Sequence, residues 1–169
     1  MPVYTEKGLR AYFVSNGQEI PAGAAMSEIE YNIPIQTEDY ESVGKFFKVA
    51  MTTGIDPMEG EATFIGMPTN ILSLIQDFKT VHEMHLFTRV QGESAESTEA
   101  DVIDRHIMML VKFMDDLPGG SREHAAPAEY ETTFQIRELR VKDNNTEILY
   151  ANAFEESYRV NGKELINLG

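Results

Sequence analysis

The sequence predicts a mainly β protein, a β-sandwich or barrel with one packed α-helix and long loops. Three observations favour this class. Apolar and polar residues alternate over several stretches, which is the period of a half-buried strand. Turn signals separate these stretches, and apolar residues follow helical spacing in one place only. We count about seven strands, no internal repeat and no interdomain linker, so we expect a single domain over residues 1–169.

The first predicted strands lie before residue 37. Residues 9–14 form a short run rich in β-formers that ends at an Asn-Gly pair, the strongest short hairpin signal. From residue 26 to 36, apolar residues alternate with polar ones, and the polar side includes Glu28 and Glu30. This pattern predicts a half-buried strand with an acidic outer face. Pro34 on that polar side lacks a backbone N–H, which indicates an edge or a bend.

Residues 37–60 match neither the strand period nor the helix period cleanly. Connections of this length are uncommon in compact domains and are usually either functional or disordered. Apolar side chains in the middle of the stretch argue against disorder; they are Phe46, Phe47, Val49 and Met51. We therefore expect an extended assembly loop whose apolar residues are buried by a neighbouring subunit.

The helix and the longest strands are predicted after residue 60. A strand over 61–66 leads to Pro68, near a helix start, and then to apolar residues at helical spacing up to Phe78. Four further strands are predicted, over residues 80–91, 105–114, 128–141 and 146–153. Residues 92–104 carry several acidic residues and no base, which indicates an exposed acidic hairpin arm, and a Pro-Gly-Gly run marks a loop over 117–127.

Two further groups of residues are candidates for contacts. Glu129 and Glu131 alternate with apolar residues that need a core, so they must face water, as Glu28 and Glu30 must. At the C-terminus, the apolar residues that follow a turn signal are too few to form a core; they are Leu165, Ile166 and Leu168. They form either a subunit contact or an edge strand docked on its own domain.

The composition excludes several functions. Asp and Glu number 28 against 14 Lys and Arg, and a net charge of −14 repels phosphate, which argues against specific nucleic-acid binding and against anionic membranes. Cysteine is absent, which removes disulfides, thiolate metal sites and cysteine nucleophiles. No signal-peptide pattern is visible and no apolar run approaches the ~20 residues that span a bilayer. We expect a soluble protein that folds in a reducing cytosol.

The histidines are the first place to look for chemistry. His82 and His85 are three residues apart on a predicted strand, so they should lie on opposite faces and not share a metal. His85 and His106 could meet across neighbouring strands, together with Glu83, but structural or surface histidines are the favoured interpretation. No nucleophile, phosphate-loop or dinucleotide motif is present. We expect no catalytic centre, no metal and no cofactor, and hence not an enzyme.

The order and spacing of several segments resemble the major tail-tube proteins of contractile-tailed bacteriophages. The similarity extends over nearly the whole chain and is carried by residues 8–13 with the following Asn-Gly turn, 24–26, 58–68 running into the helix, and 158–169. Because none of these segments has chemical function, their succession along one chain carries the resemblance, and not any single motif.

The resemblance implies a structural subunit that forms hexameric rings stacked into a tube, the conduit for DNA ejection inside a contractile sheath. It implies a lining sheet that closes across subunits, and a long loop that reaches a neighbour. The implied partners are other copies, the sheath protein, and baseplate and tail terminator proteins, with no membrane. The implied location is the virion tail, assembled in the host cytoplasm. A lining of like charge would let DNA pass without specific binding, which makes lumen candidates of Glu28, Glu30, Glu129 and Glu131.

Three alternatives remain open. The tube of a related contractile injection system, such as a phage-derived bacteriocin or a secretion system, would share the fold. A carbohydrate-binding β-sandwich would need exposed aromatic residues beside acids on a strand face, for which Tyr12, Tyr130 and Tyr150 are candidates. An enzyme with a metal site at a barrel mouth is the third.

Overall fold

The computed structural model describes the chain except for residues 1–2, 24, 41–48, 94–100, 115–116 and 168–169. The prediction of a mainly β protein with one helix is confirmed. The described elements are β1 (Val3–Ser15), β2 (Gln18–Pro21), β3 (Met26–Asn32), β4 (Ile35–Tyr40), β5 (Val49–Ile55), β6 (Met58–Ile65), α1 (Thr69–Gln76), β7 (His82–Glu93), β8 (Asp101–Phe113), β9 (Glu129–Asp143), β10 (Thr146–Asn152), β11 (Ser157–Val160) and β12 (Lys163–Asn167).

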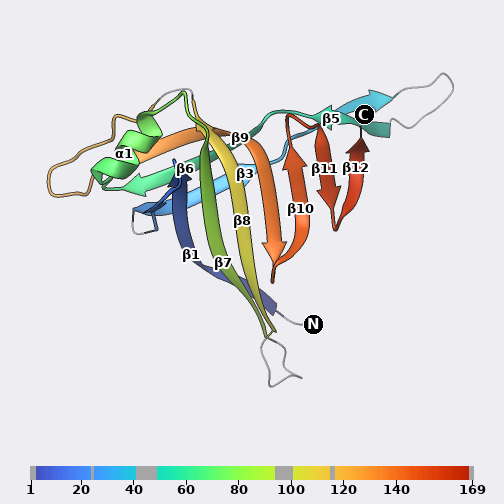
Figure 1. Ribbon diagram of the computed structural model, residues 1–169, viewed down its shortest axis with the longest axis horizontal. Coiled ribbons are helices and arrows are strands. Elements are labelled where there is room, and N and C mark those ends of the chain that lie inside the picture. The colour runs from blue at the N-terminus through green and yellow to red at the C-terminus, as the bar shows by residue number, and fades with distance from the viewer. Residues whose placement is uncertain (1–2, 24, 41–48, 94–100, 115–116, 168–169) are drawn as a thin grey trace.

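Ten of these strands form one branched antiparallel sheet. Its main path runs β12-β11-β10-β9-β8-β7-β1-β2, and β6 and β3 branch from β9. The branch arises because β9 changes partner along its length, pairing with β6 through residues 129–136 and with β10 through residues 138–143. As a result β3 and β6 cross over β7 and β8 and form a second layer (Figure 1). Among the described strands the main path stays open from β12 to β2 and does not close into a barrel.

The core lies between the two layers and under the helix. Ile71, Leu74 and Ile75 form the buried face of α1, whose first turn follows Pro68 as the sequence predicts. Beneath the helix, Phe113 lies between Phe13 and Phe134, with ring centroids 6.2 Å and 6.0 Å away. Such tilted aromatic pairs contribute beyond the area that they bury. These rings join β1, β8 and β9 into one core.

The helix is shorter than the spacing predicts. It ends at Gln76, and Phe78, expected on its apolar face, is 54% exposed. The Asp77 carboxylate accepts a hydrogen bond from the Lys79 backbone N–H at 3.2 Å. A local turn of this kind competes with the helix for backbone groups, which explains the early stop.

Residues 26–40 form two strands where the sequence predicts one strand to residue 36. The break falls at Pro34, whose carbonyl accepts a hydrogen bond from the Asp56 N–H at 2.9 Å. After it, β4 pairs only with β5, in a separate two-stranded sheet. The described parts of the expected loop over 37–60 are therefore mostly strand, and β6 begins at Met58.

The two-stranded sheet explains why residues 37–60 show no clear period. The β4–β5 hairpin extends away from the rest of the domain (Figure 1), and its described residues from Ile35 to Glu38 are exposed. A strand segment that is exposed on both faces, as Ile35 to Glu38 are, needs no alternation of apolar and polar residues. The alternation of apolar and polar residues, from which strands are predicted, is therefore missing in this segment.

The remaining strands are longer than predicted or continue into turns. β7 and β8 pair as far as Gly92 and Asp101, inside the expected acidic arm, whose residues 94–100 lie outside the described part. At the C-terminus, β11 and β12 form a hairpin around Asn161 and Gly162, which have positive φ values of 52° and 79°. This is the backbone that an Asn-Gly turn adopts readily.

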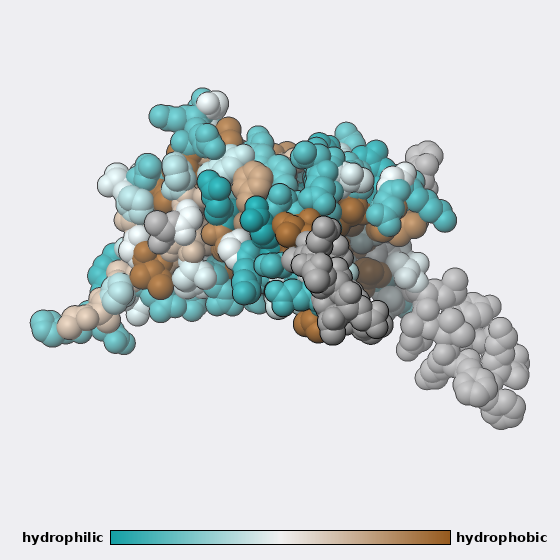
Figure 2. Space-filling model, turned by 90° about the horizontal axis from the view of Figure 1, so that it is seen from below, coloured by the Kyte–Doolittle hydropathy of each residue, from teal (hydrophilic) through white to brown (hydrophobic). Residues whose placement is uncertain are grey.

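One face of the molecule is largely polar. Viewed from below, most of it is hydrophilic and the hydrophobic residues form separate small areas (Figure 2). In the part of the chain that the structure describes, no helix combines the length and the hydrophobicity of a membrane span.

Candidate functional site: an acidic sheet face

Six glutamates lie on the outer face of the branch of the sheet. We call this surface the acidic face; it consists of Glu28 and Glu30 on β3, Glu59 and Glu61 on β6, and Glu129 and Glu131 on β9. All six are exposed. They lie there because their neighbours in sequence point to the core, in an unbroken alternation along β6. The structure thus brings together all four glutamates that the sequence singles out, and adds two.

The pairing register sets the glutamates in rows across the three strands. Glu30 lies directly opposite Glu61, and Glu61 opposite Thr133. The next row runs through Glu28, Thr63 and Glu131. Like charges directly opposite on a sheet destabilise it. None of the six carboxylates forms an ion pair with a described residue, so this repulsion is uncompensated within the described part of the domain.

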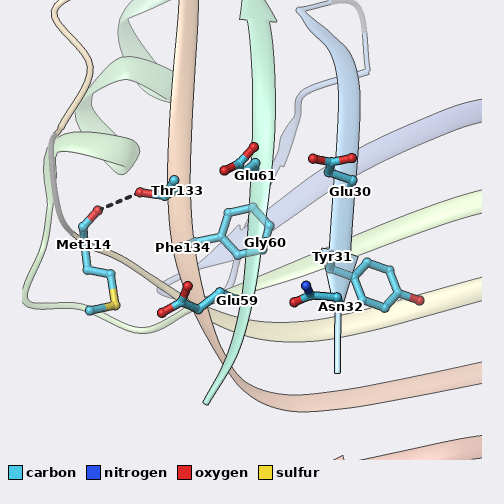
Figure 3. Close-up of a pocket in the computed structure, with 9 residues that line it drawn as sticks. All are labelled: Glu30, Tyr31, Asn32, Glu59, Gly60, Glu61, Met114, Thr133 and Phe134. Atoms are coloured by element: carbon cyan, nitrogen blue, oxygen red, sulfur yellow. Dashed lines mark hydrogen bonds between the residues drawn. The ribbon is translucent and has the colours of Figure 1, made fainter. Parts of the chain in front are cut away.

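A close contact on the core side fixes β6 against β9. Gly60 lies opposite Phe134 in the register, and a Cβ atom at Gly60 would come within 2.5 Å of two carbons of the Phe134 ring. Figure 3 shows the ring of Phe134 at Gly60, with Glu59 and Glu61 on either side along β6. Only glycine leaves room for the ring in this place. The contact therefore positions the two glutamates of β6 beside β9.

Hydrogen bonds also fix β9 in this region. The Thr132 hydroxyl is buried and donates to the Ala62 carbonyl at 3.2 Å. The Thr133 hydroxyl donates to the Met114 carbonyl at 3.2 Å (Figure 3). One bond holds β9 to β6 and the other holds it to the segment after β8. The acidic face is therefore built on a rigid support.

The chemistry available to this face is limited. Carboxylates perform acid–base catalysis when a sheltered cleft separates their pKa values, whereas these six are exposed on an open sheet. Within the described residues, no three His, Asp or Glu side chains are arranged to hold a metal ion. What the arrangement can do is repel a polyanion along its whole surface.

The histidines lie where the strand period predicts. His82 points into the core and His85 lies on the opposite face of β7. His85 and His106 meet across β7 and β8, with Nδ1 and Nε2 at 2.7 Å, and Glu83 lies 2.5 Å from the other nitrogen of His85. These nitrogens form a line of hydrogen bonds and do not converge on one point, as the ligands of a metal must.

The three tyrosines proposed for carbohydrate binding do not form one platform. Tyr130 is buried, and its hydroxyl accepts a hydrogen bond from Arg122 at 2.8 Å. Tyr150 lies between Arg140 and Arg159, whose guanidinium carbons are 5.1 Å and 4.2 Å from its ring centre. Tyr12 lies on β1, separated from β10 by three strands.

The structure describes two of the four apolar residues that the sequence proposes for the assembly loop. Phe46 and Phe47 lie outside the described residues, while Val49 and Met51 lie in β5 and pair with Tyr40 and Glu38 of β4.

At the C-terminus, Leu165 is 54% exposed in β12, which docks on its own domain as the edge strand beside β11. Ile166 lies in the same strand, and Leu168 lies outside the described residues.

Glu59 and Glu61 are the two members of the acidic face that sequence reasoning missed. The signal was present, because Met58, Gly60, Ala62 and Phe64 alternate with them. Residues 58–60 were assigned to the end of a loop, which hid the first half of this alternation.

Comparison with known proteins gives the family. The family described as Phage tail tube protein FII matches residues 23–167. Among solved structures, the chain is similar to one in the sheath/tube terminator of the extracellular contractile injection system PVC, in the extended state. The identity is 11%, the TM-score is 0.51, and the match covers 79% of this chain and 93% of that one.

A second match is to the PVC sheath-tube complex, with 12% identity, a TM-score of 0.49, and coverage of 79% and 88%. At 11% identity, the match to the sheath/tube terminator supports the fold alone. No curated protein matches the sequence. The family match, by contrast, extends over most of the chain, from the connection between β2 and β3 to the end of β12. The chain belongs to the phage tail tube protein FII family.

Proposed function

We propose that this protein is a structural subunit of a tail tube, and that it assembles into stacked hexameric rings forming the conduit for DNA ejection inside a contractile sheath. The family match over residues 23–167 carries this proposal. The fold supports it, because long paired strands joined by one core suit a wall better than a cleft. Catalysis has no part in the proposal, and the glutamates act by charge alone.

The acidic face is the proposed lining of the tube. Glu28, Glu30, Glu129 and Glu131 would face the channel, together with Glu59 and Glu61. Proteins bind DNA largely by releasing its counterions with Lys and Arg. A carboxylate lining offers no such gain, so DNA would slide past it without being held.

Exposed strand edges supply the proposed contacts between copies. β3 pairs with β6 on one side, and among the described strands its other side has no partner. An open edge on the acidic face would let the lining continue into the next copy. The β4–β5 hairpin is the proposed assembly arm, together with Phe46 and Phe47 from the segment that links its strands in the sequence, and Leu165 on β12 is a proposed second contact.

The tube of a related contractile injection system is the second candidate. The solved structures that match come from a sheath/tube terminator and a sheath-tube complex of such a system. Sheath, terminator and baseplate proteins are the proposed partners in either case. The content of the channel separates the two candidates: DNA indicates a phage tail, and protein cargo indicates an injection particle.

Electron microscopy of the purified full chain tests the assembly. We expect rings or tubes with a central hole in negative stain. A protein that stays monomeric at high concentration, and also when particles carrying the cognate baseplate are added, contradicts the tube proposal.

Charge reversal tests the lining separately. Glu129→Lys with Glu131→Lys should leave assembly intact but slow DNA release from particles, and added salt should relieve the defect. Glu155→Lys with Glu156→Lys, in the exposed turn after β10, makes the same change in net charge and should release DNA normally. Equal behaviour of the two double variants would mean that the acidic face does not line the channel.

Deletions test the contacts. Removal of residues 41–55 should leave a folded protein that does not polymerise, and tubes of normal length would refute the role of the hairpin.

Removal of residues 161–169 distinguishes the two proposed roles of the C-terminal segment, a subunit contact and an edge strand of its own domain. Loss of assembly with an unchanged unfolding temperature indicates a subunit contact, and a lowered unfolding temperature indicates an edge strand needed by its own domain.

A further inference from the structure

Four aromatic rings form a close stack on the outer face of β1, β7 and β8. We call them the ring stack; they are Tyr12 on β1, His85 and Phe87 on β7, and His106 on β8. His85 lies between Tyr12 and His106, with ring centroids 4.7 Å and 5.0 Å away and planes within 10°. Phe87 lies 4.5 Å from His106 and 5.7 Å from Tyr12. The two rings of the central strand are therefore covered on both sides.

A line of hydrogen bonds runs through the two histidines. The Glu83 carboxylate lies 2.5 Å from His85 Nε2, and His85 Nδ1 lies 2.7 Å from His106 Nε2. An ionised carboxylate can only accept, so His85 Nε2 carries a hydrogen. In a neutral His85, Nδ1 is then the acceptor, and His106 donates to it through Nε2. His106 Nδ1 remains as the one basic nitrogen of the line that accepts no hydrogen bond within it.

This line can take up one proton without breaking. A proton from solvent binds the lone pair of His106 Nδ1, and the resulting imidazolium still donates through Nε2, now in a charge-assisted bond. Within the two histidine rings, a second proton can bind only at His85 Nδ1, which is already accepting. Two N–H groups would then face each other across the present 2.7 Å, on two adjacent cations. The second proton must therefore separate the histidines.

Charged groups on the neighbouring strands act on the same line. Lys142 lies directly opposite His106 on β9. Burial, followed by the charges of His85 and Lys142, lowers the pKa of His106, and Glu83 acts in the opposite direction.

On the side of β1 and β2, neighbouring groups favour the neutral form of the Tyr12 hydroxyl. Burial first, and then the carboxylates of Glu19 and Glu83, raise the pKa of Tyr12. Arg10 lies opposite Phe87, and Arg89 and Asp104, further along the same strands, neutralise each other in an exposed ion pair at 3.0 Å. Within the described surroundings, Glu83 is the carboxylate that bonds to the line itself.

We propose that Glu83, His85 and His106 form an acid-operated latch. The latch keeps the ring stack closed through the first added proton and opens it with the second. On opening, His106 leaves the stack and uncovers one side of the Phe87 ring. The outer face of β7 and β8 thus changes from a closed polar stack to an exposed aromatic surface when the medium becomes acidic. The latch is independent of the tube assignment.

A pH titration of the full chain by NMR of the histidine ring nitrogens and the Phe87 ring protons tests the latch. We expect the ring-nitrogen signals of the His85–His106 pair to change in two coupled steps. The Phe87 signals should move in the second step. The exposed His124 serves as an internal reference. Independent single steps at His85 and His106, or Phe87 signals that do not move, would overturn the proposal.

Two variants sharpen the test. His106→Phe keeps a ring in the stack but removes its nitrogens, so the two-step change of the pair and the acid-linked shift of Phe87 should both vanish. If this variant does not fold, the Glu83→Gln variant supplies the test. It removes a charge from a partly exposed position and keeps an acceptor oxygen, and it should move the first step to lower pH. An unchanged first step in Glu83→Gln would count against the latch.

Discussion

The acidic face and the ring stack are outer surfaces of one continuous sheet, and their groups are arranged in opposite ways. In the ring stack, each ring covers another and Glu83 has a hydrogen-bond partner. On the acidic face, Glu30 and Glu61 lie opposite each other and no carboxylate has a described ion-pair partner. The first surface compensates its own charges. The second has an energetic cost that no described residue compensates, as expected if its charges act on something outside the monomer.

The largest effect should come from the core that both surfaces share. Phe134 is 1% exposed, packs edge-on against Phe113, and lies behind the acidic face. Phe134→Ala should lower the free energy of unfolding by about 3–5 kcal/mol, since it removes a large buried ring and leaves a cavity. Urea denaturation measures this loss.

Phe154→Ala is the matched control for that experiment. Phe154 is 74% exposed and contacts the guanidinium group of Arg137. Its removal should cost less than about 1 kcal/mol. Similar losses in the two variants would mean that the two layers do not depend on a common core.

A medium effect should come from His82, on the core side of the strand that carries the ring stack. His82 is 2% exposed, and neither ring nitrogen has a described partner with hydrogen-bond geometry. Burial lowers the pKa of His82, although the backbone carbonyls of Asp77 and Leu74 and the Asp77 carboxylate act against this. The unfolded chain therefore binds a proton at a higher pH than the folded one.

The sign of the pH dependence follows from this difference. Stability should be full above the ordinary histidine pKa of about 6.5 and should fall as the pH drops from there toward the folded pKa. His82→Leu should remove this part of the fall, by up to about 1.4 kcal/mol per pH unit. Unfolding free energies at about pH 7.5 and about pH 5.5 measure it. His124→Leu, at an exposed position, should leave the fall unchanged. Because the pKa of His106 is also lowered, part of the fall should remain in His82→Leu; a fall as large as in the unchanged protein would contradict the assignment to His82.

Local sequence patterns were enough to predict which side chains point away from the core. Alternation gave the outward direction of Glu28, Glu30, Glu129 and Glu131, and the period of a strand gave the opposite faces of His82 and His85. Pro34 marked a break because a missing N–H interrupts a ladder wherever the strand lies. These inferences need no knowledge of which strands are neighbours.

Most neighbour relations were not predictable from such patterns, although His85 and His106 do meet, together with Glu83, as the sequence suggests for two successive strands. The acidic face exists because β6 lies between β3 and β9, and the ring stack exists because Tyr12 pairs with His85. Both pairings join segments far apart in the sequence, and the pattern of one strand does not determine its partner. The β4–β5 hairpin was missed for a different reason, since a segment exposed on both faces, as residues 35–38 are, shows no period.

The smallest effect should come from removing one charge of the acidic face. Glu61 lies opposite Glu30, and like charges in that position cost about 0.2–1 kcal/mol. Glu61→Gln keeps the shape of the side chain and should raise the free energy of unfolding by an amount in this range at low salt. Because the glutamates are exposed, the gain should shrink between about 0.02 M and about 0.5 M salt, as the Debye length falls below the spacing of the charges.

Glu156→Gln makes the same chemical change in an exposed turn away from the acidic face. It should leave the stability nearly unchanged at both salt concentrations. If Glu61→Gln behaves in the same way, or lowers the stability, then the acidic face is not under repulsion in the monomer. The contrast with the ring stack would then disappear, and the case for a charged lining would depend on the family match and on the DNA-release experiment alone. A salt-sensitive gain confined to Glu61→Gln would instead show that the subunit carries a destabilising surface, as expected if that surface acts in the assembled tube.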